Sequence, residues 1–140
     1  MININTPIDQ LNKLSEDTLI QQLNIEYLEV GDGFVKARMP VNERTKQPMG
    51  ILHGGANLAL AETIGGLGSA LIVGLDKFDV RGSQMSANHV GTAHAGWVFA
   101  EATIIHRGRN THVWNIDITN EEGKMVSTCR LTNFIIKRQI

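Results

Sequence analysis

HGGANLALAETIGGLGSALIVG, residues 53–74, carries almost no charge, because Glu62 is its only ionisable side chain after His53. Its many glycines weaken an isolated helix, so tertiary packing must hold the segment in a helical conformation. A helix that is apolar nearly all round and built from small side chains suits burial, with sheet backbone approaching closely on several sides. The segment therefore predicts a central helix over residues 53–74 that is wrapped by a sheet.

A membrane span is the alternative interpretation of this segment. The uncharged part after Glu62 ends before Asp76, and it is shorter than the roughly 20 apolar residues that cross a bilayer. A glutamate inside a membrane is also costly. We therefore expect a buried helix and no membrane partner.

The flanking segments show the patterns of strands and short helices. Residues 8–23 predict one or two short helices, and residues 25–41 predict a hairpin with its turn at Gly31-Asp32-Gly33. Alternating apolar side chains predict four further strands, at residues 79–90, 97–106, 111–120 and 125–136. This order predicts one α+β domain over residues 1–140, with the helix packed on one antiparallel sheet. We expect four side chains in its core: Trp97, Phe99, Trp114 and Cys129.

The composition is that of an ordinary globular protein. Hydrophobic residues make up 42%, charged residues 19%, and the formal net charge is -1, so we expect no nucleic-acid partner. Lysines and arginines are scattered, apart from groups at Arg107/Arg109 and Lys137-Arg138, so any recognised anion is expected to be small, such as a phosphate-bearing coenzyme. The single cysteine fits a reducing cytoplasm, and the N-terminal residues lack the basic start and apolar run of a secretory signal.

The start of the central helix and Glu62 are the groups best suited to chemistry. His53-Gly54-Gly55 offers free backbone N–H groups and the positive end of the helix dipole to a carbonyl oxygen or an oxyanion. Glu62 lies roughly 12 Å further along the helix and faces away from His53. Within one chain the two groups cannot meet on one substrate carbonyl. Either Glu62 is structural, or two chains pair their helices antiparallel in a twofold dimer with two equivalent sites.

Other interpretations of these residues compete with a catalytic one. Glu62 can be a solvent-facing carboxylate, His53 a residue bonded to backbone at the helix start, and Gln47 a solvated loop residue. The turn at 106–111 can be a solvated hairpin or, with its arginines and N–H donors, a phosphate-binding loop. No histidine pair has a cysteine or carboxylate at metal-ligand spacing, so we expect no metal site.

Longer strings resemble a known family. Residues 42–55, from Asn42 to Gly55, together with Leu60-Ala61-Glu62-Thr63-Ile64-Gly65 and Ser86-Ala87-Asn88-His89-Val90, resemble the hotdog-fold acyl-CoA thioesterases of the 4-hydroxybenzoyl-CoA and phenylacetate-pathway type. The branch that acts on 1,4-dihydroxy-2-naphthoyl-CoA is the most similar. The resemblance runs from about residue 18 to residue 136.

The resemblance implies a fold, an assembly and a role for each motif residue. It implies a sheet wrapped round a central helix, a homodimer and often a homotetramer of two dimers. Glu62 would act as nucleophile or general base, Gly54 N–H of the partner helix would stabilise the oxyanion, and Gln47 and His53 would orient and polarise the thioester. No metal or redox cofactor is implied, because coenzyme A is part of the substrate. The implied coenzyme-binding residues are Gly82, His89, Val90, Gly91, Thr92, His106, Arg107, Gly108, Arg109, Asn110 and Thr111.

Two departures from the family pattern keep other functions open. Relatives commonly carry Ser or Thr one turn after the catalytic glutamate, where this chain has Gly66, so the help of that hydroxyl is either missing or comes from elsewhere, with Thr63 and Ser69 as candidates. A basic residue often follows the Asn-His-Val string, where this chain has Gly91-Thr92, which shifts phosphate binding towards Arg107 and Arg109. The alternatives are an acyl-CoA-binding protein without hydrolysis and an enoyl-CoA hydratase or dehydratase. The acyl group, aromatic or medium-chain, and the pathway, menaquinone synthesis or aromatic degradation, stay open.

Overall fold

The central helix forms as predicted. In the computed structural model, which describes residues 1–139, α3 (Gly54–Val73) is one continuous helix with His53 as its N-cap. Gly74 ends it with a φ of 77°, in a conformation that glycine adopts without strain. Of the described helices, α3 alone is long and apolar enough to cross a membrane, but 56% of its most apolar window is buried in the fold, as in a core helix.

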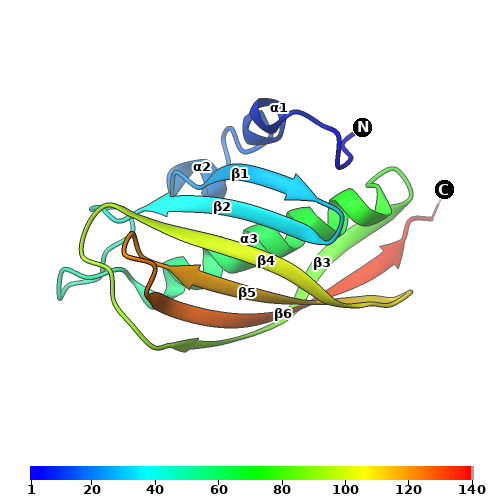
Figure 1. Cartoon of the computed structure of the whole chain (residues 1–140). Coiled ribbons are helices and arrows are strands. Elements are labelled where there is room, and N and C mark those ends of the chain that lie inside the picture. Colours follow the sequence, from blue (N-terminus) through cyan, green and yellow to red (C-terminus); the bar gives the residue numbers. More distant parts are fainter. Residues whose placement is uncertain (140) are drawn as a thin grey trace.

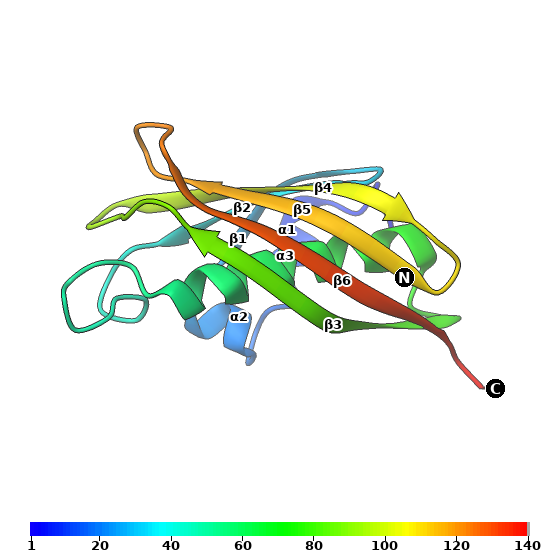
Figure 2. The same ribbon diagram turned by 90° about the horizontal axis from the view of Figure 1, so that it is seen from below.

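Six antiparallel strands form one sheet that curves around α3 (Figures 1 and 2). They are β1 (Glu26–Gly31), β2 (Phe34–Pro40), β3 (Phe78–His89), β4 (Trp97–Arg107), β5 (Thr111–Thr119) and β6 (Met125–Lys137). The strand order is β1-β2-β4-β5-β6-β3, and α3 packs against β2, β3, β4, β5 and β6. The predicted hairpin and the four later strands are confirmed to within two residues at each end.

The core lies between α3 and the concave face of the sheet. Leu60 and Ile64 of α3 and Trp114 of β5 are completely buried, and each such side chain contributes about 1.5–3 kcal/mol of hydrophobic stabilisation. Glycines make this packing possible, because a Cβ atom at Gly68 would lie 2.6 Å from Cζ2 of Trp114. The expectation that small residues let the sheet approach the helix is confirmed.

The two edges of the sheet differ in what lies beside them. The predicted short helices, α1 (Ile8–Lys13) and α2 (Leu19–Gln22), precede β1. The Asn12 side chain bonds both backbone groups of Tyr27, donating to its carbonyl at 3.1 Å and accepting from its N–H at 2.8 Å, so α1 is attached to the β1 edge. β3 forms the other edge, and within residues 1–139 no strand pairs with its outer side.

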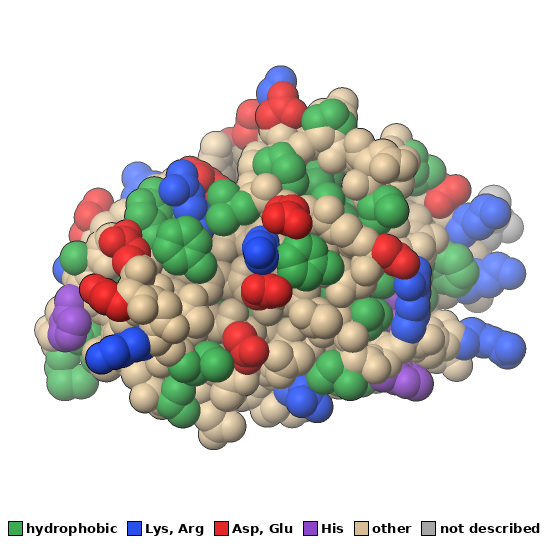
Figure 3. Space-filling view, in the orientation of Figure 1, with side chains coloured by type: hydrophobic (Ala, Val, Ile, Leu, Met, Phe, Trp, Pro, Cys, Tyr) green, Lys and Arg blue, Asp and Glu red, His purple; other side chains and the backbone are tan. Residues whose placement is uncertain are grey.

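Two of the four predicted core side chains lie elsewhere. Trp114 and Cys129 are buried as expected, but Phe99 is 36% exposed and Trp97 is half-buried. In β4 the inward positions belong to Val98 and to the alanines that alternate with it, so the intervening aromatic side chains face outwards. Figure 3 shows one face of the molecule, where acidic and basic side chains are interspersed with exposed hydrophobic ones.

Candidate active site

His53 caps the start of α3 with its own side chain. Its Nδ1 accepts a hydrogen bond from the Gly55 N–H at 2.7 Å, and a Cβ atom at residue 55 would lie 2.9 Å from the imidazole ring. In a neutral imidazole whose Nδ1 accepts, the proton is on Nε2. His53 is exposed, so this N–H is available to donate to a ligand. The interpretation of His53 as a residue bonded to backbone is confirmed, and it leaves one donor free.

Gly54 supplies the free backbone donor at the helix start. His53 accepts from the Gly55 N–H with its side chain and from the Ala56 N–H, at 3.0 Å, with its carbonyl oxygen. In the described part of the chain, the Gly54 N–H has no hydrogen-bond acceptor. It lies at the positive end of the helix dipole. An oxyanion at this position would therefore meet one unused N–H group and a favourable field.

His89, at the end of β3, lies against the same glycine. Its Nε2 is 2.7 Å from the position that a Cβ atom would take at Gly54. Its Nδ1 is 2.9 Å from the Oγ of Ser127, a fully buried residue, so the ring is held in place from below. The fold thus joins a predicted coenzyme-binding residue to the predicted oxyanion site. Without the family resemblance, the residue pattern offers only one functional interpretation of His89, that of a metal ligand.

Glu62 packs on Gly82, a third of the way along β3. A Cβ atom at residue 82 would lie 3.0 Å from Oε2 of Glu62. Glu62 is exposed, and in residues 1–139 its carboxylate has no hydrogen bond or ion pair. It borders a hollow of about 450 Å³ that is lined also by Leu19, Leu58, Ala59, Thr63 and Met85. The carboxylate is thus open to a ligand.

A β-bulge makes Gly82 and His89 face the same side of the sheet. The register of β3 against β6 shifts between Gly82 and Gln84, which leaves Ser83 without a partner. Without this extra residue, Gly82 and His89 would point to opposite faces. Both point towards α3, roughly 20 Å apart along the strand. One chain therefore holds two half-sites, Glu62 on Gly82 and His89 on Gly54, and does not bring them together.

The turn at 106–111 lies at the Gly82 end of the sheet. Gly82 of β3 pairs with Asn133 of β6, and Asn133 pairs with His112 of β5, directly after the turn. The Gly108 N–H is used inside the turn, donating to the Thr111 carbonyl at 2.9 Å. Arg107 forms an exposed ion pair with Asp32, with 3.0 Å between Nη1 and Oδ1. Arg109, His106 and Asn110 are exposed in the same turn.

The remaining predicted residues of the site lie at the helix-start end. Val90 is 62% exposed, and Thr92 is exposed. A Cβ atom at Gly91 would collide with the Met125 carbonyl oxygen, so a side chain is not accommodated there. Gln47 is half-buried, and its side-chain oxygen accepts from the Met49 N–H within the loop before α3. This loop returns to the helix start, where the His53 N–H donates to the Thr45 carbonyl at 2.8 Å.

Ser69 does not supply the hydroxyl that is missing at Gly66. It is completely buried, and its Oγ accepts from Nε1 of Trp114 at 2.9 Å and from Nδ2 of Asn133 at 3.0 Å. Because Trp114 and Asn133 both donate to this oxygen, the hydroxyl proton of Ser69 is left to donate to Nδ1 of His112, at 2.8 Å. The prediction for Ser69 is wrong, because the residue faces the sheet. Thr63, beside Glu62 on the exposed side of α3, is the remaining candidate.

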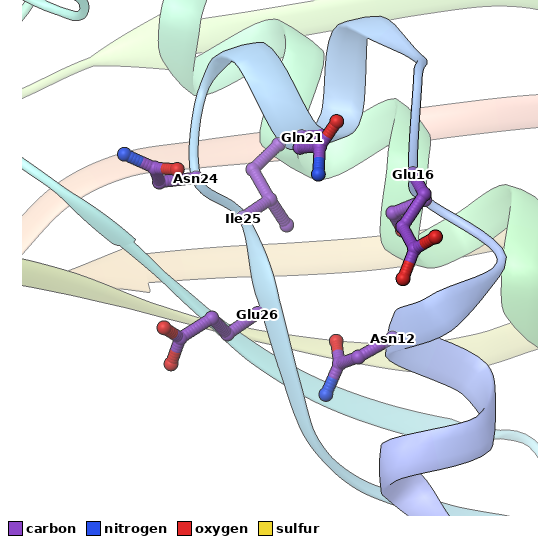
Figure 4. A pocket seen from close by; sticks show the side chains of 7 residues that line it. Asn12, Glu16, Gln21, Asn24, Ile25 and Glu26 are labelled. Carbon is purple, nitrogen blue, oxygen red and sulfur yellow. The ribbon is translucent and has the colours of Figure 1, made fainter.

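Another hollow, of about 310 Å³, lies beside α1, α2 and β1 (Figure 4). Polar side chains of this N-terminal region line most of it, and none of the predicted site residues does. Among residues 1–139, no group of three His, Cys, Asp or Glu side chains is placed to hold a metal ion.

A six-stranded antiparallel sheet that curves around one long central helix is the hotdog fold. Residues 49–127 match the model of the thioesterase superfamily. The chain is similar to a mutant of a thioesterase from Pseudomonas aeruginosa, with 36% identity, a TM-score of 0.93 and coverage of 99% of this chain and 100% of that one. It is also similar to a thioesterase from Haemophilus influenzae, with 41% identity, a TM-score of 0.91 and coverage of 98% and 96%. A mutant thioesterase from Staphylococcus aureus is 42% identical, with a TM-score of 0.83 over 84% of this chain and 98% of that chain.

This chain belongs to the thioesterase superfamily and has the hotdog fold. The hotdog fold that the sequence motifs imply is thereby confirmed, and so is the family at the level of the thioesterase superfamily. By homology the protein is a thioester hydrolase.

Proposed function

We propose that this protein is an acyl-CoA thioesterase whose active sites are each built from two chains. One observation carries the proposal: the free Gly54 N–H lies under His89 at one end of β3, and the free Glu62 carboxylate lies on Gly82 towards the other. An oxyanion donor and a carboxylate are the two groups that thioester hydrolysis needs. Their separation within the chain calls for a second copy.

The unpaired outer edge of β3 is the natural contact between the two copies. If two β3 strands pair antiparallel about a twofold axis near Met85 and Ser86, Gly82 of one protomer lies opposite His89 of the other. Glu62 of one protomer then approaches Gly54 of its partner. The axis passes near the hollow lined by Leu58 and Met85, which the second copy would cover. Further pairing of two such dimers would give a tetramer.

The chemistry follows from the groups that this dimer brings together. The thioester carbonyl oxygen accepts hydrogen bonds from the Gly54 N–H and from Nε2–H of His53, which polarise the carbonyl carbon. Glu62 of the other protomer either attacks that carbon itself or removes a proton from an attacking water. The C–S bond then breaks, the thiolate leaves and takes up a proton, and water supplies the hydroxyl of the free acid. Gln47, in the loop at the helix start, would help to orient the thioester.

The coenzyme would lie along the predicted residues at the junction of the two protomers. The turn at 106–111 adjoins the Gly82 end of its own β3, and residues 89–92 of the partner come to the same end by the twofold pairing. Arg109 is free to bind a phosphate group, and Arg107 can exchange its exposed ion pair with Asp32 for one with a phosphate at little cost. Both sets of residues can thus contact one coenzyme in the dimer but not in the monomer.

For the acyl group we propose an aromatic type, with 1,4-dihydroxy-2-naphthoyl-CoA and hydroxybenzoyl-CoA ahead of medium-chain substrates. The strings around Gln47 and Glu62 support this order, because they are most similar to the 1,4-dihydroxy-2-naphthoyl-CoA branch. A CoA-linked substrate is also consistent with a cytoplasmic enzyme.

The decisive experiment measures thiol release from a panel of aromatic and fatty acyl-CoAs. We expect Glu62→Gln to lower turnover about 100-fold or more, because it removes the nucleophile or base but keeps the shape of the side chain. Gly54→Val should also be inactive, because a side chain there displaces His89. Dissociating and mixing the two inactive variants should restore about a quarter of wild-type activity, since half of the dimers are hybrids with one intact site.

Other outcomes would support other functions. Recovery of activity on mixing would not occur if the site lay within one chain. Tight binding of acyl-CoA without any thiol release by the wild type would favour a binding protein. Addition of water to an enoyl-CoA, with no loss of coenzyme, would favour a hydratase.

A further inference from the structure

Gly66 is a glycine that no contact within residues 1–139 requires. Its neighbours Gly65 and Gly68 are explained by packing, because a Cβ atom at either would collide with Leu131 or Trp114. A Cβ atom at Gly66 would meet no atom of the described residues within 4 Å. Its φ is not in the left-handed region, since α3 is continuous there. Only proline is a poorer helix former than glycine, so a glycine at this position weakens α3 without an internal benefit.

The open space at Gly66 adjoins the candidate carboxylate. Residues four apart lie on the same face of a helix, so Gly66 is one turn, roughly 6 Å, beyond Glu62. Gly66 is partly exposed. The missing side chain therefore leaves a gap on the surface next to the reacting group.

The chemistry of a thioester indicates what fills this gap. Its carbonyl carbon carries two substituents, the sulfur of the coenzyme and the acyl group. On the proposed function, the coenzyme runs past Gly82 on the sheet side of Glu62 towards the turn at 106–111. The helix surface beyond Glu62 is then left for the acyl group.

We infer that Gly66 is a specificity-determining residue, and that the acyl group of the substrate lies across it. This inference rests on the proposed function and narrows it to acyl groups too broad to pass a side chain at position 66. A fused or substituted aromatic ring is such a group, whereas an acetyl group is not. On this inference, glycine at position 66 lowers the stability of α3 but leaves the space that the acyl group of the substrate needs.

The test compares Gly66→Ala and Gly66→Val with the wild type, and uses Val73→Ile as a control that adds a methyl group further along the exposed side of α3. We expect Gly66→Ala to raise Tm by about 3 °C, because alanine favours the helix and has free space. The ratio of kcat/KM for naphthoyl-CoA to kcat/KM for acetyl-CoA should fall at least about tenfold. Gly66→Val should lower it further, and Val73→Ile should not change it.

A readout independent of turnover separates this inference from the proposed function. Inert thioether analogues of the same acyl-CoAs should lose affinity for Gly66→Ala in the same order, measured by calorimetry. Absence of thiol release by the wild type, with this order of affinities intact, would overturn the hydrolase assignment and keep the inference. An unchanged ratio and unchanged affinities, a failure of the wild type to bind the aromatic analogue, or a loss of the dimer in Gly66→Ala would overturn the inference.

Discussion

The buried side and the exposed side of α3 differ in how far contacts within the chain explain which residues they carry. On the buried side, Gly65 and Gly68 are fitted to side chains of the sheet, and Ser69 bonds three of them. On the exposed side, Glu62 lies against Gly82, and a Cβ atom at Gly66 would meet no atom of residues 1–139 within 4 Å. Contacts within the fold therefore account for these buried residues of α3, whereas no contact within residues 1–139 accounts for Gly66. Substitutions on the buried side should act on stability, and those on the exposed side on activity.

The largest expected effect is that of Gly68→Ala. The added methyl group would lie 2.6 Å from Cζ2 of Trp114, whose ring is completely buried. Overpacking of this kind costs about 1–3 kcal/mol, and the better helix propensity of alanine offsets up to about 1 kcal/mol of it. We expect a net loss of about 2 kcal/mol in the free energy of unfolding, measured by urea denaturation at fixed protein concentration.

The same chemical change at Gly66 is the matched control for this prediction. Gly66→Ala should gain stability, because the added methyl group has free space. Equal stability changes at the two positions would show that the two sides of the helix do not differ in packing.

Ser69→Ala should have a somewhat smaller effect. It leaves Nε1 of Trp114 and Nδ2 of Asn133 without their shared acceptor in a fully buried place. A buried donor that loses its partner costs about 1–3 kcal/mol, although Asn133 keeps a second bond, to the Gly65 carbonyl at 3.1 Å. We expect a loss of about 1.5 kcal/mol in the free energy of unfolding, measured by urea denaturation. Thr63→Ala, on the exposed side, should stay within about 0.5 kcal/mol of the wild type, and a comparable loss there would contradict the contrast.

The sequence was sufficient for those elements whose patterns are local. The bounds of α3 follow from its first and last glycines, and those of β5 from the alternation of Trp114, Ile116 and Ile118. The prediction that Phe99 lies in the core is wrong, because an aromatic side chain on a strand does not reveal which face of the sheet is buried. Val98 and Ala100, on either side of it, occupy the inward positions. The positions of the strands are thus easier to predict from the sequence than the face of the sheet on which each side chain lies.

The candidate site could be predicted only in part, for the same physical reason. Glu62 and Gly54 stand out locally, as the lone carboxylate in an apolar helix and the start of that helix. The packing of His89 on Gly54 and of Glu62 on Gly82 depends on the register of β3 and on the bulge at Ser83. The Ser69 cluster, which consists of Ser69, His112, Trp114 and Asn133, joins residues more than 40 positions apart in the sequence. No local pattern reveals such contacts.

The smallest expected effect concerns the pH dependence of stability, through His112 on the sheet side of the Ser69 cluster. Ser69 accepts two hydrogen bonds, so its single proton points to Nδ1 of His112, which must be unprotonated. Burial, together with the nearby positive charges of Arg107 and His106, lowers the pKa of His112 below its usual value. Below about pH 6.5 the unfolded chain binds a proton at this position that the folded chain still excludes. The free energy of unfolding should therefore decrease as the pH is lowered, by at most about 1.4 kcal/mol per pH unit, until the pH reaches the pKa of His112 in the folded protein.

This contribution can be isolated by comparing the wild type with His112→Gln, whose amide oxygen can accept from Ser69 but does not titrate. Urea denaturation of both proteins at pH 7, 6 and 5 should give a smaller decline for the variant. Because the other four histidines are present in both proteins, their titration cancels in the difference. Parallel declines would mean that protonation of His112 is not excluded by the fold, and the buried side of α3 would then be less strictly specified than the hydrogen bonds around Ser69 indicate.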